Sequence, residues 1–395
     1  MKTADGLAWT VVAATLACGA GFRAGAAGFT LPIALDHNRI LVDVQFEKKD
    51  GSFRKARAWV DSGGPSLILG GPLAQELGIE WEAPAAAGRE AKVDTALPRG
   101  MRFGDLPLPL DGVACTVCPH LAQPFAGVPA EARLPSAVMS RFDVLFDYPG
   151  RRMTLAPRGT LRHRGVRVPC LVEAKTGIVQ FDVRMAGETV SFALDNGATC
   201  TLVREDLAVQ AGQRNPAWAT RRGLLGCANM WGMEQETEWA MIRLGEILVG
   251  GVAVSDAGAA CLPKGLFEWY SKKTASPVAG LLGPNVLKAF RVGIDFAGGA
   301  VYLERVLRDD PHDMDLVGLT LRPNRDGTFD VIAAAESTGA MPGDRLLKVG
   351  GLDAAGQTMG QVVDALRGKP GSKRRLVLER RGETRTVEAT VIRYL

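Results

Sequence analysis

An Asp-x-Gly segment occurs twice in this 395-residue chain, in the same local setting both times. Residues 59–69 read WVDSGGPSLIL, and residues 193–203 read ALDNGATCTLV. In each copy an apolar run leads into Asp-x-Gly, small residues follow, and a second apolar run comes next. Glycine two positions after the aspartate permits a tight turn, so each copy predicts two strands joined by a turn that presents a carboxylate.

Further matches flank the two copies in the same order. The matched segments are predicted hairpins at 40–60 and 178–194, MRFGDL at 101–106 with IRLGEI at 242–247, and FDVLFDY at 142–148 with FRVGIDF at 290–296. The period of about 140 residues is far longer than that of a solenoid or propeller repeat. The pattern therefore predicts two related β-rich halves, residues 27–157 and 158–306.

Composition narrows the possible classes of protein. Hydrophobic residues make up 47% and charged residues 23%, which excludes a disordered, collagen-like or coiled-coil chain. The 47 glycines and 22 prolines exceed average usage and indicate many turns between short strands. The net charge of +4 is spread along the chain without a block of like charges, so nucleic-acid binding is not expected. The predicted fold class is mainly β.

The duplicated turns suggest a specific chemistry. Two turns related by approximate twofold symmetry would bring Asp61 and Asp195 together. Two carboxylates at hydrogen-bonding distance cannot both ionise, so the pair shares one proton. The unprotonated oxygen can then activate a water while the protonated one donates to a carbonyl, which hydrolyses a peptide bond without metal, cofactor or covalent intermediate.

These residues resemble the retropepsin-like aspartic proteases, whose active site takes Asp-Thr-Gly or Asp-Ser-Gly from each half. GLLG at 280–283 extends the resemblance, which covers roughly residues 30–306. It implies a pseudodimer of acid-protease β-barrel halves, an aspartic endopeptidase acting on peptide or protein substrates, and catalytic Asp61 and Asp195. It also implies flaps near 82–100 and 213–238. The residues expected to support the active-site turns are Ser62, Gly63, Asn196 and Gly197.

Three departures from the family pattern bear on activity. Asn196 stands where the family has Thr or Ser, although its amide can still donate and accept hydrogen bonds. ARLP at 132–135 occupies the place that GLLG has in the second half, with both glycines lost and a charge gained. Gly64-Pro65 makes the first turn unusual. These departures keep open an alternative function, a catalytically impaired peptide-binding or scaffold protein on the same folds.

Residues 61–65, DSGGP, also resemble the nucleophile loop of trypsin-like serine proteases. That mechanism needs a histidine base and an orienting aspartate, which in this family precede the serine by a whole barrel. Here His37 is the only histidine before Ser62, and Val60 replaces the leading glycine of the motif. Asn196 stands where the second copy would need a nucleophile. A serine protease using Ser62 is therefore the less favoured alternative.

The amino-terminal residues 1–26 have the pattern of a signal peptide. Lys2 precedes an apolar stretch at 7–22 that is too short to span a bilayer, and AGA at 24–26 offers small residues for cleavage. We therefore expect export to a bacterial periplasm or the extracellular space, with no transmembrane segment in the mature chain. A retained leader, or a lipid on Cys18, would instead associate the protein with a membrane.

Six cysteines follow the predicted leader: Cys115, Cys118, Cys170, Cys200, Cys227 and Cys261. An even number in an exported chain permits disulfides, but the sequence does not resolve their connectivity. CTVC at 115–118 has redox or metal spacing, yet no second pair of ligands follows at finger spacing, and Pro119 excludes haem attachment. A structural or paired role is predicted for these cysteines, with no metal.

The carboxy-terminal region begins after a polar stretch at 307–316 that predicts a linker. Residues 317–395 resemble a bacterial PDZ domain, an α+β fold. VGLTL at 317–321 matches the carboxylate-binding loop and groove strand of that family, and PGDRLLKVGG at 342–351 matches its Gly-Asp turn and strand.

The PDZ resemblance implies a groove helix over residues 358–367 and a peptide ligand bound by strand addition. Gly318, Leu319 and Thr320 would hold the carboxy terminus of that ligand. The segment at 337–341 is shorter than usual for the family, which leaves the shape of the groove open.

Overall fold

The computed structural model describes residues 28–81, 97–119, 121, 129–222, 239–324, 326–393 and 395. The protein is mainly β, as the sequence predicts, with four sheets and a few short helices. The predicted leader at 1–26, Cys227, and the greater part of both predicted flaps (82–96 and 223–238) lie outside the described residues. Within the described part of the chain, no helix is both long and apolar enough to cross a membrane.

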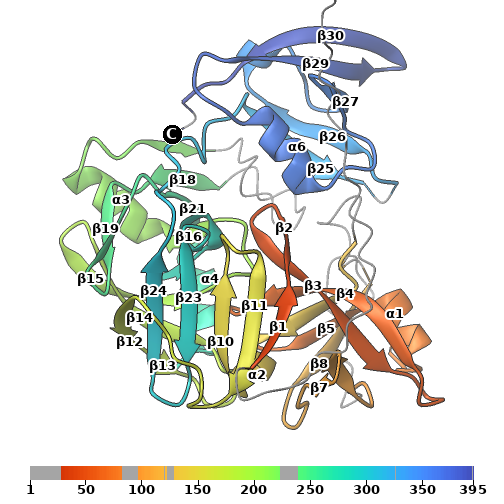
Figure 1. Cartoon of the computed structure of the whole chain (residues 1–395). Coiled ribbons are helices and arrows are strands. Elements are labelled where there is room, and N and C mark those ends of the chain that lie inside the picture. Colours follow the sequence, from red (N-terminus) through yellow and green to blue (C-terminus); the bar gives the residue numbers. More distant parts are fainter. Residues whose placement is uncertain are drawn as a thin grey trace, which may run out of the picture.

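A six-stranded antiparallel sheet joins the two halves of the duplicated region (Figure 1). Its order is β1-β11-β10-β23-β24-β12. The bounds are β1 Phe29–Pro32, β10 Phe142–Asp147, β11 Arg152–Pro157, β12 Val166–Pro169, β23 Phe290–Asp295 and β24 Ala300–Arg305. The predicted boundary between residues 157 and 158 falls between β11 and β12.

The register of this sheet is twofold symmetric. At its centre, β10 and β23 pair antiparallel with Leu145 opposite Gly293, and the sequence repeat matches these same two residues. On either side, β11 pairs with β10 as β24 pairs with β23, and β1 and β12 close the two ends. Each half thus offers the same surface to the other, as in an isologous dimer interface.

A second sheet has the order β7-β6-β3-β4-β9-β5-β8, with β2 paired to β3. Its strands are β2 Ala34–Asp36, β3 Arg39–Glu47, β4 Phe53–Asp61, β5 Leu67–Gly70, β6 Met101–Phe103, β7 Leu106–Pro107, β8 Cys115–Cys118 and β9 Ala132–Pro135. The helices α1 Gly71–Glu76 and α2 Ser136–Met139 follow β5 and β9. Alternate apolar residues of β3, β4 and β5, such as Val42, Val60 and Leu67, are buried in the main core. Leu41, Trp59 and Ile68 are buried in a separate small cluster.

The third sheet has the order β17-β18-β21-β16-β22-β15-β14-β19-β20, with β13 paired to β14. Its strands are β13 Leu171–Val172, β14 Val179–Met185, β15 Glu188–Leu194, β16 Thr201–Arg204, β17 Thr220–Arg222, β18 Ala240–Arg243, β19 Glu246–Val249, β20 Val252–Ser255, β21 Gly258–Leu262 and β22 Gly280–Leu282. Its helices are α3 Glu205–Arg214, α4 Lys264–Ser271 and α5 Pro284–Leu287.

The second and third sheets share their central pairing. β4 pairs parallel with β9 and β5 parallel with β8, as β15 pairs parallel with β22 and β16 parallel with β21. β9 and β5 are antiparallel, and so are β22 and β16. Each aspartate therefore lies at the end of a strand that pairs with a strand distant in the sequence, β9 for Asp61 and β22 for Asp195.

The match between residues 101–106 and 242–247 is wrong. β6 pairs with β3, but its counterpart beside β14 is β19, not β18. The hairpin of β6 and β7 corresponds to the hairpin of β19 and β20, which turns at Gly250-Gly251. Both hexapeptides carry a glycine after an apolar residue, but Gly245 lies between two strands and does not close a hairpin.

The carboxy-terminal sheet has the order β25-β26-β27-β29-β30, with β28 paired to β27. Its strands are β25 Leu319–Pro323, β26 Phe329–Ala334, β27 Arg345–Val349, β28 Leu352–Asp353, β29 Lys373–Arg380 and β30 Glu383–Thr390. A 3-10 turn, η2 Glu336–Thr338, follows β26, and the helix α6 Met359–Leu366 begins at a Thr358 capping box with Gln361.

The segment at 307–316, predicted as a linker, is fastened to the third sheet. Buried Arg243 of β18 donates to the Asp315 carboxylate at 3.0 Å and to the Leu395 carbonyl at 2.7 Å. Met314 is fully buried and packs against Gly258. On the other side of the interface, Asp36 accepts a hydrogen bond from the Gly360 amide of α6 at 2.7 Å. The carboxy-terminal sheet is thereby packed on the duplicated region (Figure 1).

Candidate functional site

The two Asp-x-Gly turns face each other at the centre of the duplicated region. Asp61 ends β4 and Asp195 follows β15, and their carboxyl groups lie close enough for each to shift the pKa of the other. A Cβ built on Gly63 would lie 2.6 Å from Asp195 Cγ, and one on Gly197 would lie 2.5 Å from Asp61 Cγ. Only glycine at these positions lets each turn approach the opposing carboxyl group so closely.

Main-chain amides orient each carboxyl group from within its own turn. The Gly63 amide donates to Asp61 Oδ1 at 3.0 Å. The Gly197 amide donates to Asp195 Oδ1 at 2.9 Å, and the Ala198 amide adds a second bond to the same oxygen at 3.1 Å. The Oδ2 atoms accept none of these three hydrogen bonds.

Ser62 and Asn196 tie the two turns together. The Ser62 amide donates to Asn196 Oδ1 at 2.8 Å, and the Asn196 amide donates to Ser62 Oγ at 3.0 Å. The Ser62 hydroxyl in turn donates to the Leu194 carbonyl at 3.1 Å. Because that proton is directed at a main-chain carbonyl, this geometry does not support Ser62 as a nucleophile activated by a base.

The crosslink between the turns is not symmetric. Asn196 is fully buried, and its Nδ2 has no hydrogen-bond partner among the described residues. Ser62, at the matching position, satisfies both its donor and its acceptor. A buried donor without a partner costs about 1–3 kcal/mol, so Asn196 carries a penalty that Ser62 does not.

Burial dominates the electrostatics of the pair. Asp61 and Asp195 are 6% and 7% exposed. Burial and, to a smaller extent, the neighbouring Asp61 charge raise the pKa of Asp195 to about 7. Burial also raises the pKa of Asp61, but the Arg133 charge opposes this rise. The protonation of one carboxyl therefore depends on the protonation of the other.

Arg133 is the cation of this site. It lies on β9 opposite Trp59 of β4, with Nε 3.4 Å from Asp61 Oδ2 and a side chain 16% exposed. The matching position of the second half, Leu281 on β22, is apolar and buried. The sequence showed that the first half gains a charge here, but the strand register was needed to place it on the aspartate.

Two tyrosines near the aspartates carried no signal in the sequence. Tyr270 of α4 donates to the Gly63 carbonyl at 2.8 Å, so a helix of the second half holds the first turn. Tyr148, after β10, is 2% exposed. Burial raises the pKa of both hydroxyls, and the Asp195 charge adds to the rise, so both remain neutral.

The residues predicted to bind a peptide terminus lie in the carboxy-terminal sheet. Gly318 has a positive φ of 77°, and its carbonyl accepts a hydrogen bond from the Ala335 amide at 2.8 Å. Leu319 and Thr320 begin β25, which stands at the end of the strand order, and both are buried. The structure thus groups these three residues at a sheet edge, separate from the aspartates.

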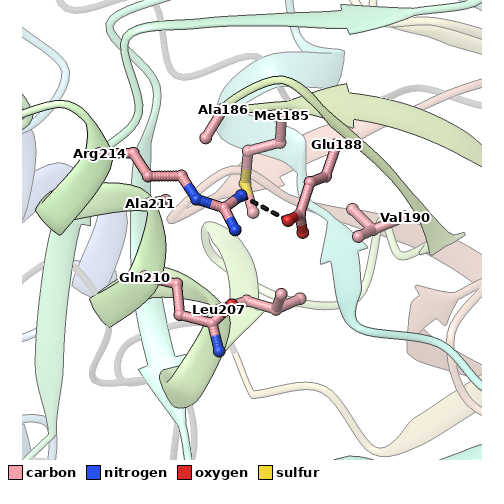
Figure 2. Close-up of a pocket in the computed structure, with 8 residues that line it drawn as sticks. All are labelled: Met185, Ala186, Glu188, Val190, Leu207, Gln210, Ala211 and Arg214. Atoms are coloured by element: carbon pink, nitrogen blue, oxygen red, sulfur yellow. Dashed lines mark hydrogen bonds and ion pairs between the residues drawn. The ribbon is translucent and has the colours of Figure 1, made fainter.

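A small pocket with a volume of about 10 Å³ lies elsewhere, between the β14–β15 hairpin and α3 (Figure 2). Its two charged residues, Glu188 and Arg214, form an ion pair across it. The volume is far below the range of about 300–1,000 Å³ typical of small-molecule sites, and no unpaired charge faces the pocket from these lining residues. It offers little chemistry compared with the aspartate pair.

The described cysteines do not form a metal site. Cys115, Cys170 and Cys261 are free thiols, and burial raises the pKa of each to about 12. Across the described residues, no group of three or more His, Cys, Asp or Glu side chains is placed to hold a metal ion. The three thiols are accordingly unreactive structural residues at neutral pH.

No protein-family model matches the chain, and neither does any curated protein. Among solved structures, an aspartic proteinase from Irpex lacteus is similar with a TM-score of 0.42 and 11% identity, covering 71% of this chain and 98% of the other. Basic 7S globulin from soybean is similar with a TM-score of 0.40 and 11% identity, covering 70% and 95%.

A photosystem II D1 C-terminal processing protease is also similar, with 29% identity and a TM-score of 0.18. That likeness covers 19% of this chain, and the chain spans only 22% of the processing protease. The structures that this chain resembles thus include two proteases.

Proposed function

We propose that the protein is an aspartic endopeptidase whose catalytic residues are Asp61 and Asp195. The observation that carries the proposal is the contact between the two buried carboxyl groups, each held by the amides of its own turn. Crowding by the opposing glycines and the crosslink of Ser62 with Asn196 keep the pair in this geometry. Sharing one proton makes one carboxyl a base and the other an acid at the same pH.

The reaction needs both states of the pair. One aspartate takes a proton from a water as that water attacks the carbonyl carbon of the scissile bond, and the other donates its proton to the carbonyl oxygen. When the resulting diol collapses, the first aspartate gives its proton to the leaving nitrogen and the second recovers a proton from the diol. Burial makes these transfers less sensitive to bulk water because the local dielectric is low.

The carboxy-terminal sheet would bind a peptide or protein carboxy terminus along β25, which is an edge strand in the described sheet. Gly318 and the start of β25 would contribute main-chain amides to that terminus. Such tethering raises the local concentration of a substrate at the aspartates without adding catalytic contacts. Export, as the leader predicts, would place this activity in the periplasm or outside the cell.

A non-catalytic, peptide-binding protein on the same fold is the second candidate. The observation that favours it is the state of the aspartates themselves, which are 6% and 7% exposed and carry an arginine on one of their outer oxygens. Binding without cleavage would need the peptide groove but no proton transfer.

Cleavage of a peptide library by residues 27–395, from acid to neutral pH, separates the two candidates. We expect cleavage by the wild type and a loss of about 10³-fold in kcat/KM for Asp61→Asn and for Asp195→Asn, since each removes a proton-transfer group. Asp295→Asn is the matched control, because its carboxylate only accepts the Gly298 amide in a surface turn. Equal activity of wild type, Asp61→Asn and Asp195→Asn would refute the dyad, and binding without any cleavage would favour the second candidate.

A further inference from the structure

We infer that Arg133 divides the two roles of the dyad: it holds Asp61 as the carboxylate, leaves Asp195 as the proton carrier, and extends activity toward acidic pH. This inference rests on the proposed peptidase function. Arg133 is a positioning residue in this scheme, because it acts through Asp61 and needs no contact with substrate.

The first support is the position of the guanidinium. Arg133 Nε lies 3.4 Å from Asp61 Oδ2, the oxygen of Asp61 that the Gly63 amide leaves unbonded. Arg133 Nη2 also lies 3.4 Å from the Ser66 carbonyl, just beyond the first turn. The guanidinium is thus held between the outer oxygen of Asp61 and the chain that leaves the turn.

The second support comes from Gly64, the residue that makes the first turn unusual. A Cβ at position 64 would lie 2.8 Å from Asp61 Cγ and 3.2 Å from Arg133 Cζ. A side chain there would enter the space in which the cation and the carboxylate meet. The second half has Ala198 after its own glycine and Leu281 in place of the arginine, so both departures of the first half belong to one feature.

The third support is the absence of a competing charge among the described groups that interact with the pair. Besides Asp61, Asp195 and Arg133, these groups are Tyr270 from α4 and Tyr148 after β10. Both tyrosines are neutral, because burial raises the pKa of their hydroxyls. Among these groups Arg133 is the cation, and it lowers the pKa of Asp61 against the effect of burial while the pKa of Asp195 rises to about 7.

The roles in hydrolysis follow from this asymmetry. Asp61 accepts the proton of the attacking water, and Asp195 donates its proton to the carbonyl oxygen as the new C–O bond forms. On collapse, Asp61 passes the proton to the nitrogen, the C–N bond breaks, and a diol hydroxyl returns a proton to Asp195. The active state requires an ionised Asp61, so activity at low pH ends when Asp61 becomes protonated.

The pH dependence of kcat/KM tests this inference with three variants. Arg133→Leu installs the residue of the second half, Arg133→Lys keeps the charge, and Arg54→Leu removes an arginine paired with Glu76 and Glu131 near the far end of β4. We expect Arg133→Leu to move the acid limb up by about one to three pH units, the usual effect of an adjacent arginine on an aspartate. Arg133→Lys should keep the limb close to its wild-type position, and Arg54→Leu should leave it in place.

An unmoved acid limb in a folded, active Arg133→Leu variant would overturn the inference and leave the dyad intact. So would an equal shift in Arg54→Leu, which would show a general effect of net charge. A loss of kcat at all pH values without any shift, unrelieved by Arg133→Lys, would show that Arg133 only supports the fold.

A second readout does not need activity. Carboxyl chemical shifts of ¹³C-labelled aspartate, compared with Asp61→Asn and Asp195→Asn for assignment, follow the protonation of each residue directly. We expect Asp61 to titrate at lower pH than Asp195 in the wild type, and the difference to shrink in Arg133→Leu. If the wild type cleaves nothing, the proposed function fails, yet this titration still supports or overturns the asymmetry of the pair.

Discussion

Asp61 and Asp195 stand at matching places in two related halves, yet their surroundings differ. The first turn has a cation on β9, a glycine that makes room for it, and a tyrosine from α4 on its Gly63 carbonyl. The second turn has apolar Leu281 in place of the cation and Asn196 with an unbonded Nδ2. The two halves share a twofold-symmetric strand arrangement, but the side chains around the two aspartates differ and affect their pKa values differently.

The strongest test of the shared frame is the pair of glycines that contact the opposing aspartates. We expect Gly63→Ala and Gly197→Ala each to lower the free energy of unfolding by about 3 kcal/mol, because the added methyl overlaps a buried carboxyl group. Chemical denaturation measures both changes, and Gly265→Ala, with open space around its Cα, is the control. If only one of the two substitutions had a small effect, the two turns would not pack equally tightly against the opposing carboxyl groups.

The proton affinity of Asp195 predicts a pH dependence of stability. Its pKa is about 7 in the folded protein and about 3.9 in an unfolded chain, so the folded state binds the proton more tightly. Ionisation of Asp195 therefore removes stability as the pH rises from about 4 to about 7. We expect Asp195→Asn to be more stable than wild type at pH 8, by on the order of 2 kcal/mol, and the gain to vanish near pH 4.

Urea unfolding of both proteins across this range measures the effect. Asp295→Asn, at the end of β23, controls for the general loss of one negative charge. A gain that is the same at pH 4 and pH 8 would contradict the raised pKa of Asp195.

The smallest expected effect concerns the unequal crosslink. Asn196→Ser would give the second half the same residue as the first and remove the buried Nδ2, so we expect a gain of about 1 kcal/mol in stability. The reverse change, Ser62→Asn, should lower stability because it breaks the hydroxyl bond to the Leu194 carbonyl. Thermal unfolding at one pH compares the two, and a loss of stability in Asn196→Ser would show that the bond from the Ser62 amide to Asn196 Oδ1 outweighs the cost of the unbonded Nδ2.

The sequence predicted many of the strands and turns of the two halves, because these elements depend on local residue patterns. Alternating apolar residues and glycine turns gave the β class, and two copies of Asp-x-Gly located the aspartates that the structure brings together. The PDZ resemblance also implied a helix over 358–367, and the structure has one over Met359–Leu366 with Thr358 as its N-cap. The match between residues 101–106 and 242–247 was wrong, because the glycines of these similar hexapeptides occupy different places in their sheets.

By itself, the sequence determined that two turns of one kind exist and that their chain segments form strands, since turn chemistry and periodicity act over a few residues. The tertiary structure decided what each aspartate meets. Arg133 reaches Asp61 only because β9 pairs with β4 in parallel at one register, and Tyr270 reaches Gly63 only because α4 packs across the interface between halves. Such contacts depend on pairing between distant strands, which no local pattern specifies, and they set the charge of the site.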